Sequence, residues 1–317
     1  TRHYRREQTE WLAISEQASA ESARRRLVRD VRNSFLELYY QELAQSIVTD
    51  ARGLFAQLVD ITRSHYASGR VSQQDVLRSS LELSRLDDRT TRIRNEADRN
   101  RAALMKWIGD AAMLPLSRDF PQLPPLPEKA DLEAALEEHP AIRLETAKIE
   151  AENRKVKIAR EQYKPGWSAG LEYRKRFGED PDGSDRADMM AAMVSLDLPL
   201  FPKNRQDRRL AASLQQAEAI VLSRDDRLRE LQRMLETDYA NWTRLGERAA
   251  LYDSQLLQEA AANARASLKA YRSGVTEFNT LMRARIADLD VRLEALRIRV
   301  DRARARANLL YLAGDMP

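Results

Sequence analysis

The stretch YASGRVSQQDVLRSS at residues 66–80 and the stretch YRSGVTEFNTLMRAR at residues 271–285 carry the same motif. Each begins with Tyr-Xaa-Ser-Gly and continues into a long, highly charged helical pattern. Aligned without gaps, the similarity extends to WIGD at residues 107–110 and LAGD at residues 312–315. The sequence therefore predicts a tandem duplication of one helical hairpin. Packing of such repeats against each other buries the apolar seam that a single copy would expose.

The glycines of the two motifs, Gly69 and Gly274, mark the predicted turns of the hairpins. Glycine readily takes the left-handed conformation that ends a helix. Ser72 and Thr276 follow closely and are candidate caps for the next helix. Each turn is thus predicted to join two antiparallel helices.

Proline placement separates the helical parts of the chain from the middle. Ten of the 11 prolines lie between Pro115 and Pro202, and a proline inside a helix costs about 3 kcal/mol. The segments outside this region are therefore free to form long helices. The expected elements are helices over 19–68 and 73–108, an extended linker over 114–127, and shorter helices over 130–139 and up to residue 163.

After Pro202 the helical pattern is almost uninterrupted. An apolar residue recurs every seven positions at Leu214, Val221, Leu228 and Leu235, and the pattern continues to Trp242 and Ala249. Sustained heptads indicate a supercoiled seam against neighbouring helices. A single helix from about residue 203 to 269 would measure roughly 100 Å at 1.5 Å per residue.

Two segments near residues 166–176 and 188–199 change to a period of two, which predicts strands. Trp167, Ala169 and Leu171 alternate with polar residues or glycine, and Val194 and Leu196 do the same in the second segment. A polar turn cluster at residues 178–185 lies between the segments and predicts a β-hairpin. Each strand has the length that a tilted transmembrane strand needs. A small soluble hairpin that caps the helices is the alternative reading.

Composition argues against several other classes. No apolar run reaches the roughly 18 residues that a membrane helix requires. Cysteine is absent, and His3, His65 and His139 lack the spacing of metal ligands. His65 is expected on a helix surface, and Met189, Met190 and Met193 are interpreted as apolar strand residues rather than soft-metal ligands.

Enzymatic activity and nucleic-acid binding are also not expected. No phosphate-binding loop or nucleophile–base set is present, so the chain is predicted to have no catalytic residues, no metal and no cofactor. The net charge is +4, and basic residues alternate with acidic ones rather than forming a stripe. We therefore expect no nucleic-acid partner.

Four segments together resemble the outer-membrane efflux protein family of the TolC type. They are HYASGRVSQQDVLRSSLELSRLDDR at 65–89, AYRSGVTEFNTLMRARIADLDVR at 270–292, EEHPAIRLETAKIEAENRKVKIAREQYKPGWSAGLEY at 137–173 and VSLDLPLF at 194–201. The resemblance implies a mainly α fold, in which long antiparallel coiled-coil hairpins form part of an α-barrel and one β-hairpin belongs to a transmembrane β-barrel. It also implies a homotrimer in outer-membrane lipid of a Gram-negative bacterium, extending into the periplasm.

The same resemblance implies a division of the chain into four parts. Residues 1–114 would form the first helical hairpin of the periplasmic α-barrel, and 115–163 a proline-rich linker with short equatorial helices. Residues 164–202 would form the β-hairpin, and 203–317 the second helical hairpin. Family members have two strand pairs, and residues 1–29 hold no alternating apolar segment. The chain, which begins at Thr1, is therefore expected to be a trimmed fragment that lacks the first pair.

The implied function is a passive exit duct for small molecules or metal ions, served by an inner-membrane pump and a periplasmic adaptor. The alternative is a periplasmic adaptor or a structural coiled coil without a channel. By resemblance, the turns of the hairpins dock the adaptor, and a helix turn does expose unpaired backbone groups to a partner. The residues expected at these tips are Gly69, Arg70, Val71, Ser72, Asp75, Gly274, Val275 and Thr276.

The resemblance also places a periplasmic gate just beyond the second tip, at Thr280 and Arg283. Neither residue is acidic, whereas acidic rings occur there in family members. Three arrangements of Arg283 remain open: an ion pair with Asp75, a basic ring facing the lumen, or a solvated outer position. A lumenal ring of arginines would disfavour small cations.

Overall fold

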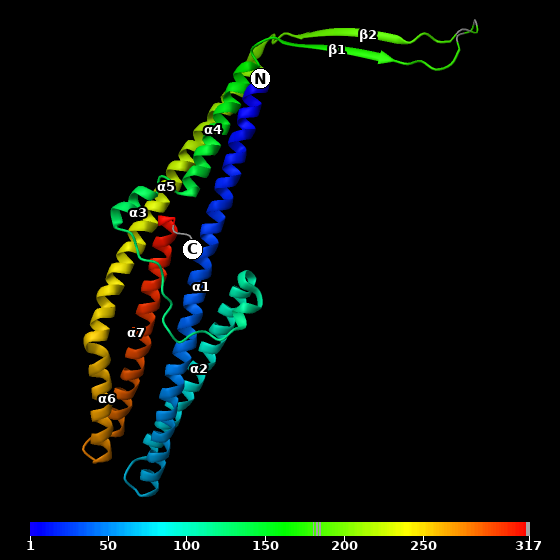
Figure 1. Ribbon diagram of the computed structural model, residues 1–317. Helices are drawn as coiled ribbons and strands as arrows, with labels where there is room; N and C mark the ends of the chain where they lie inside the picture. The colour runs from blue at the N-terminus through cyan, green and yellow to red at the C-terminus, as the bar shows by residue number, and fades with distance from the viewer. Residues whose placement is uncertain (180, 182, 184, 315–317) are drawn as a thin grey trace. The chain divides into compact units, whose positions relative to one another are not determined.

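The computed structural model describes residues 1–179, 181, 183 and 185–314, and helices dominate it (Figure 1). Asp315, the last residue of the repeated LAGD motif, lies outside the described residues. In chain order the elements are α1 (Arg2–Ala67), α2 (Gln73–Ile108), η1 (Gly109–Met113), α3 (Lys129–Ala135), α4 (Pro140–Glu161), β1 (Gly166–Arg174), β2 (Met189–Asp197), η2 (Pro202–Asn204), α5 (Gln206–Leu251), η3 (Tyr252–Leu256), α6 (Leu257–Arg272) and α7 (Phe278–Ala313).

The chain forms two compact units. The first consists of Thr1–Glu21 and Pro140–Arg229, and the second of Ser22–His139 and Glu230–Pro317. Both units are discontinuous in sequence, because α1 and α5 contribute residues to each of them.

In the first unit, polar contacts join α1, α4 and the start of α5. The Glu7 carboxylate forms an ion pair with the Arg154 guanidinium at 2.9 Å. The hydroxyl of Tyr163, just after α4, donates a hydrogen bond to the Asp207 carboxylate at 2.6 Å. One face of α4 is buried at helical spacing, and its small side chains permit close approach of neighbouring helices. This face comprises Ala141, Ile142, Ala147, Ala151, Val156 and Ala159.

The predicted β-hairpin is present, and β1 pairs with β2 in an antiparallel register from Gly166 opposite Asp197 to Arg174 opposite Met189. This register unites the apolar positions of both strands on one face. Trp167 lies opposite Leu196, and Ala169 lies opposite Val194. Every residue of both strands is exposed in the isolated chain, so the hairpin presents an apolar face that the protomer itself does not cover.

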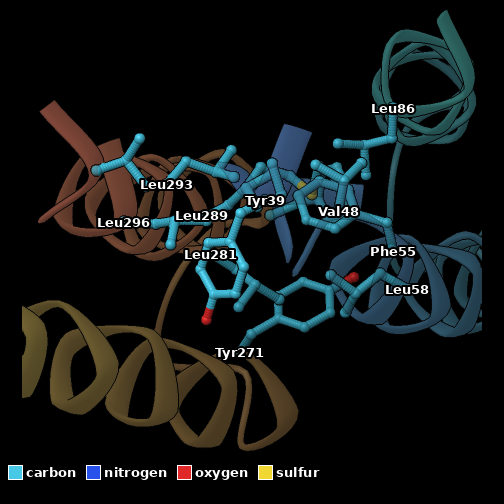
Figure 2. Close-up of a cluster of buried hydrophobic side chains, with 14 of the residues drawn as sticks. Tyr39, Val48, Phe55, Leu58, Leu86, Tyr271, Leu281, Leu289, Leu293 and Leu296 are labelled. Carbon is cyan, nitrogen blue, oxygen red and sulfur yellow. The ribbon is translucent and has the colours of Figure 1, made fainter. Parts of the chain in front are cut away.

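The second unit contains the two predicted helical hairpins, α1 with α2 and α6 with α7 (Figure 1). Their seams share one buried cluster, and Figure 2 shows side chains from all four helices converging in it. The labelled members are Tyr39, Val48, Phe55, Leu58, Leu86, Tyr271, Leu281, Leu289, Leu293 and Leu296. The duplicated hairpins are therefore held together by the seams that each would expose alone.

Glycines end the second helix of each hairpin in equivalent positions. Gly109 follows α2 with φ of 57°, and Gly314 follows α7 with φ of 87°. A positive φ is accessible to glycine at little cost. The repeat thus extends over the whole of both hairpins.

Three expectations about helix bounds need correction. Helix α1 begins at Arg2 rather than near residue 19, because the residues before 19 contain no glycine or proline and are rich in good helix formers. Helix α3 is shorter than expected and ends at Ala135. The long helix after Pro202 contains the π-helical turn η3, which separates α5 from α6. Heptad spacing does not reveal such a turn, because it inserts one residue without ending the helix.

The heptad seam on α5 is covered over only part of its length. Leu231 and Leu235 are 1% exposed, whereas Leu214 is 44% exposed and Val221 is 36% exposed. Among the described residues, no helix is long and apolar enough to cross a membrane.

Candidate functional site at the paired helix turns

The two repeated turns have the same backbone geometry. Gly69 and Gly274 have φ of 69° and 73°. Each glycine N–H donates to the carbonyl three residues earlier, at 2.9 Å and 3.0 Å. The next residue, Arg70 or Val275, donates to the carbonyl five residues earlier, at 2.8 Å and 2.9 Å. These are the two bonds of a Schellman motif, which satisfies the last carbonyls of the helix.

The helices after the turns begin differently. Ser72 caps α2: its hydroxyl accepts from the backbone N–H of Asp75 at 3.3 Å, and the Asp75 carboxylate accepts from the Ser72 N–H at 3.2 Å. This is a reciprocal capping box. The expectation that Thr276 caps α7 is wrong, because the N-cap is Glu277 and makes no side-chain capping bond. Glu277, like Ser72, lies three residues after its glycine, so the repeat fixes the position of the cap.

Both turns line one cavity of about 720 Å³. All eight residues expected at the tips border it: Gly69, Arg70, Val71, Ser72, Asp75, Gly274, Val275 and Thr276. The structure therefore brings together two motifs that lie far apart in sequence.

The residues of the two turns that border this cavity are accessible to a partner. A Cβ built on Gly69 or Gly274 would meet no atom within 4 Å. Val275 is 80% exposed, an unusual position for a β-branched apolar residue. A concave surface with an exposed apolar side chain is suited to receive a partner.

A contact between His65 and Tyr271 joins the two helical repeats, and both residues line the tip cavity. The Tyr271 hydroxyl lies 3.4 Å from Nδ1 of His65, and the Tyr271 ring packs edge-on against Phe278 at a centroid distance of 5.8 Å. Burial raises the pKa of Tyr271, so its hydroxyl stays protonated at neutral pH. His65 is therefore half-buried at an interface between the repeats, and the expectation of a simple helix-surface position was wrong.

The residues expected at the gate lie in the first turns of α7. Thr280 and Arg283 are both exposed in the isolated chain. Within the part of the chain that the structure describes, Asp75 and Arg283 form no ion pair, and the Asp75 carboxylate instead bonds to Ser72.

Other residues, not identified from the sequence, link α2 to α7. Arg89 donates to Asp290 at 2.9 Å, and Arg78 donates to Asn279. Both pairs are separated by 201 residues, which means that α2 and α7 run parallel and in one register. The signal available in the sequence was an Arg paired with an Asp or Asn at the same separation, 201 residues, but it is recognisable only when the packing register is known.

The described residues contain no cluster of three or more His, Cys, Asp or Glu side chains that could hold a metal ion. The features that the site does offer are shape, exposed backbone turns and charge.

Comparison with known proteins identifies a protein family that matches this chain. The sequence profile of the outer membrane efflux proteins matches residues 132–315. No curated protein matches the chain.

Several solved structures share the fold. The outer-membrane channel OprN is 19% identical, with a TM-score of 0.83, and the match covers 97% of this chain and 70% of OprN. A membrane protein from Pseudomonas aeruginosa is 16% identical, with a TM-score of 0.88 and coverage of 97% and 70%. The outer membrane protein VceC from Vibrio cholerae is 17% identical, with a TM-score of 0.78 and coverage of 97% and 76%.

Proposed function

Because the chain belongs to the outer membrane efflux protein family, we propose that it serves as the exit duct of a tripartite exporter. Members of this family are channels in the outer membrane of Gram-negative bacteria that extend into the periplasm and take part in tripartite efflux. The family is one of ducts and not of enzymes. In the proposed role, small molecules or metal ions pass through the duct passively, and an inner-membrane pump supplies the energy.

The cavity shared by the two turns carries this proposal. An adaptor that ends in a helical hairpin needs a concave acceptor, and the cavity between the paired turns, with the exposed Val275 side chain at its border, offers one. The matched geometry at Gly69 and Gly274 supports two similar docking positions on each protomer. We assign adaptor docking to the eight residues expected at the tips, all of which are among the residues that border the cavity.

Two surfaces left exposed by the protomer support the proposed assembly. The apolar face of the hairpin, with Trp167 and Val194, is proposed to contact outer-membrane lipid. The uncovered part of the α5 seam, with Leu214 and Val221, is proposed to pack against a neighbouring copy in a homotrimer. The alternative of a channel-free adaptor or coiled-coil spacer finds no support in the family match.

We place the periplasmic gate at Thr280 and Arg283, on the first two turns of α7. Their exposure in the protomer is compatible with a position at the pore. The Arg89–Asp290 pair joins α2 to α7 further along α7, and its side chains are 36% and 54% exposed. Such a pair contributes only about 0–1 kcal/mol on its own, so it can open without a large energetic cost.

Substitution of the tip glycines tests the proposed docking. Gly69→Leu and Gly274→Leu place a bulky side chain on the docking surface at a positive φ, and each should abolish efflux in cells that supply the matching pump and adaptor. Gly53→Leu is the matched control, because Gly53 lies within α1, is exposed, and has no neighbour within 4 Å of its Cβ position.

Expression and trimer content should be the same in all three variants. Normal efflux by both tip variants would contradict the docking assignment. Equal loss of efflux in the Gly53→Leu control would show that any added leucine on these helices is harmful.

A further inference from the structure

A second cavity lies in the same unit, away from the tips, and we call it the Trp242 pocket. It has a volume of about 440 Å³ and lies between the extended linker, α5, η3 and α7. Its lining includes Phe120 and Leu123 of the linker, Trp242 of α5, and Arg299, Arg302 and Arg306 of α7. Its volume is within the range of small-molecule sites.

The linker wall of the pocket is fixed to the core. The Tyr39 hydroxyl donates a hydrogen bond to the carbonyl of Arg118 at 2.9 Å. The Tyr39 ring packs edge-on against the Phe120 ring, with 5.5 Å between the ring centroids. Leu123 packs against the main buried cluster. The pocket is therefore a formed feature of the fold, although one of its walls is an irregular segment.

Its three arginines differ in their partners. Arg299 is ion-paired with Asp253, the acidic residue that lines the pocket. The Nε atoms of Arg302 and Arg306 are buried and have no hydrogen-bond partner, and neither guanidinium has an ion pair within the described residues. Burial and the neighbouring Arg302 guanidinium hold the pKa of Arg306 below its usual value.

Buried donors without partners are uncommon in folded proteins, and cationic ones are particularly unfavourable. Two adjacent guanidiniums of this kind form a site that an anion would complete, because carboxylates accept paired N–H bonds from arginine. The excess positive charge thus selects an anion and disfavours a neutral ligand or a cation.

Two aromatic side chains, Phe120 and Trp242, also line the pocket. The Arg302 guanidinium lies over the Trp242 ring at 5.2 Å from its centroid. Phe120 borders the same space and is 37% exposed. A planar apolar group could pack against these rings while its charged end meets the arginines.

The absence of a side chain at Gly246 leaves room for the Arg302 guanidinium. A Cβ at this residue would lie 3.1 Å from three atoms of the Arg302 guanidinium. Glycine inside a helix is unfavourable compared with alanine, so the missing side chain on α5 is explained by the close approach of this arginine.

We propose that the Trp242 pocket binds small aromatic carboxylates. The carboxylate bonds to Arg302 and Arg306, and the ring packs against Trp242 and Phe120. This site is separate from the helix tips and does not rest on the proposed duct function.

Isothermal titration of the purified protein in detergent tests the ligand class. Benzoate is the probe, acetate supplies the carboxylate without the ring, and benzamide supplies the ring without the charge. Benzoate should bind at least tenfold more tightly than either. Absence of benzoate binding would overturn the proposal, and acetate binding as tight as that of benzoate would overturn its aromatic part.

Three variants test the location. Arg306→Gln removes one guanidinium, and Gly246→Ala displaces Arg302 without changing the charge. Both should weaken benzoate binding at least tenfold. Arg304→Gln is the control on the same helix, because Arg304 pairs with Glu37 outside the pocket, and it should bind like the unaltered protein.

Thermal unfolding without ligand supplies an independent readout. Arg306→Gln and Gly246→Ala should unfold at the same or a higher temperature than the unaltered protein, because one removes a guanidinium whose buried Nε has no partner and the other removes a helix-interior glycine. Unchanged benzoate affinity in both variants would place the binding elsewhere and overturn the assignment.

Discussion

At the scale of single residues, the backbone conformation of a glycine decides what its replacement does. Gly53 lies inside α1, where alanine is favoured over glycine by roughly 0.5–1 kcal/mol. Gly69 has φ of 69°, where an L side chain costs roughly 1–2 kcal/mol. Gly53→Ala should therefore raise the thermal midpoint and Gly69→Ala should lower it. Shifts of the same sign in a thermal unfolding experiment would contradict this account of the tips.

Arg283 provides a second prediction at this scale. If it lines the proposed gate, three copies in a trimer place a basic ring at the pore. Arg283→Ala should then shift the ion selectivity of single channels toward cations, whereas Arg283→Lys should retain the original selectivity. An unchanged reversal potential for Arg283→Ala would place this side chain on the outer face of the helix.

At the scale of elements, the contact between α2 and α7 is the most direct link between the repeats. Asp290→Asn and Arg89→Gln should each raise channel conductance, and the double variant should raise it no further, because both remove the same ion pair. Arg85→Gln is the control, since Arg85 pairs with Glu82 on its own helix at 2.7 Å. Additive effects of the two substitutions would show that the pair does not act as a unit.

The two faces of the β-hairpin predict opposite responses to a charge. Val194 lies on the apolar face with Trp167 and Leu196, and its neighbour Met193 lies on the other face opposite Gly170. A lysine facing lipid costs roughly 2–4 kcal/mol near the middle of the membrane. Val194→Lys should therefore reduce the amount of protein in isolated outer membranes, and Met193→Lys should not. Equal recovery of both variants would contradict the assignment of the lipid face.

Local patterns were sufficient to predict most elements. Period-two alternation placed both strands to within two residues, and the Ser-Gly steps placed both turns, because these features depend on neighbours in the sequence. The features that were missed depend on packing. The Arg89–Asp290 pair needs the register of two distant helices, and the Trp242 pocket needs the path of the linker across α7. The cap at Glu277 was missed because a residue with poor capping propensity occupies the place that the repeat dictates.

At the scale of the whole molecule, the protomer leaves two kinds of apolar surface exposed. The hairpin exposes Trp167, Leu171 and Val194, and α5 exposes Leu214 and Leu222. Surfaces of this kind are normally covered by lipid or by another protein chain. An oligomeric duct in the outer membrane would cover both, which is why the fold and the proposed function are consistent with each other.

Photocrosslinking tests whether the paired tips dock a periplasmic adaptor. The chain has no cysteine, so a single introduced cysteine gives a benzophenone photocrosslinker one defined position within these residues. Val275→Cys places the probe at the tip cavity, and Trp107→Cys places it on exposed surface at the far end of α2.

After irradiation of intact cells, mass spectrometry of the crosslinked products identifies the partner. We expect the probe at residue 275 to capture the helical hairpin of a periplasmic adaptor and the probe at residue 107 not to capture it. Capture of the adaptor from residue 107 alone, or from neither position in cells with active efflux, would show that the tips are not the docking site.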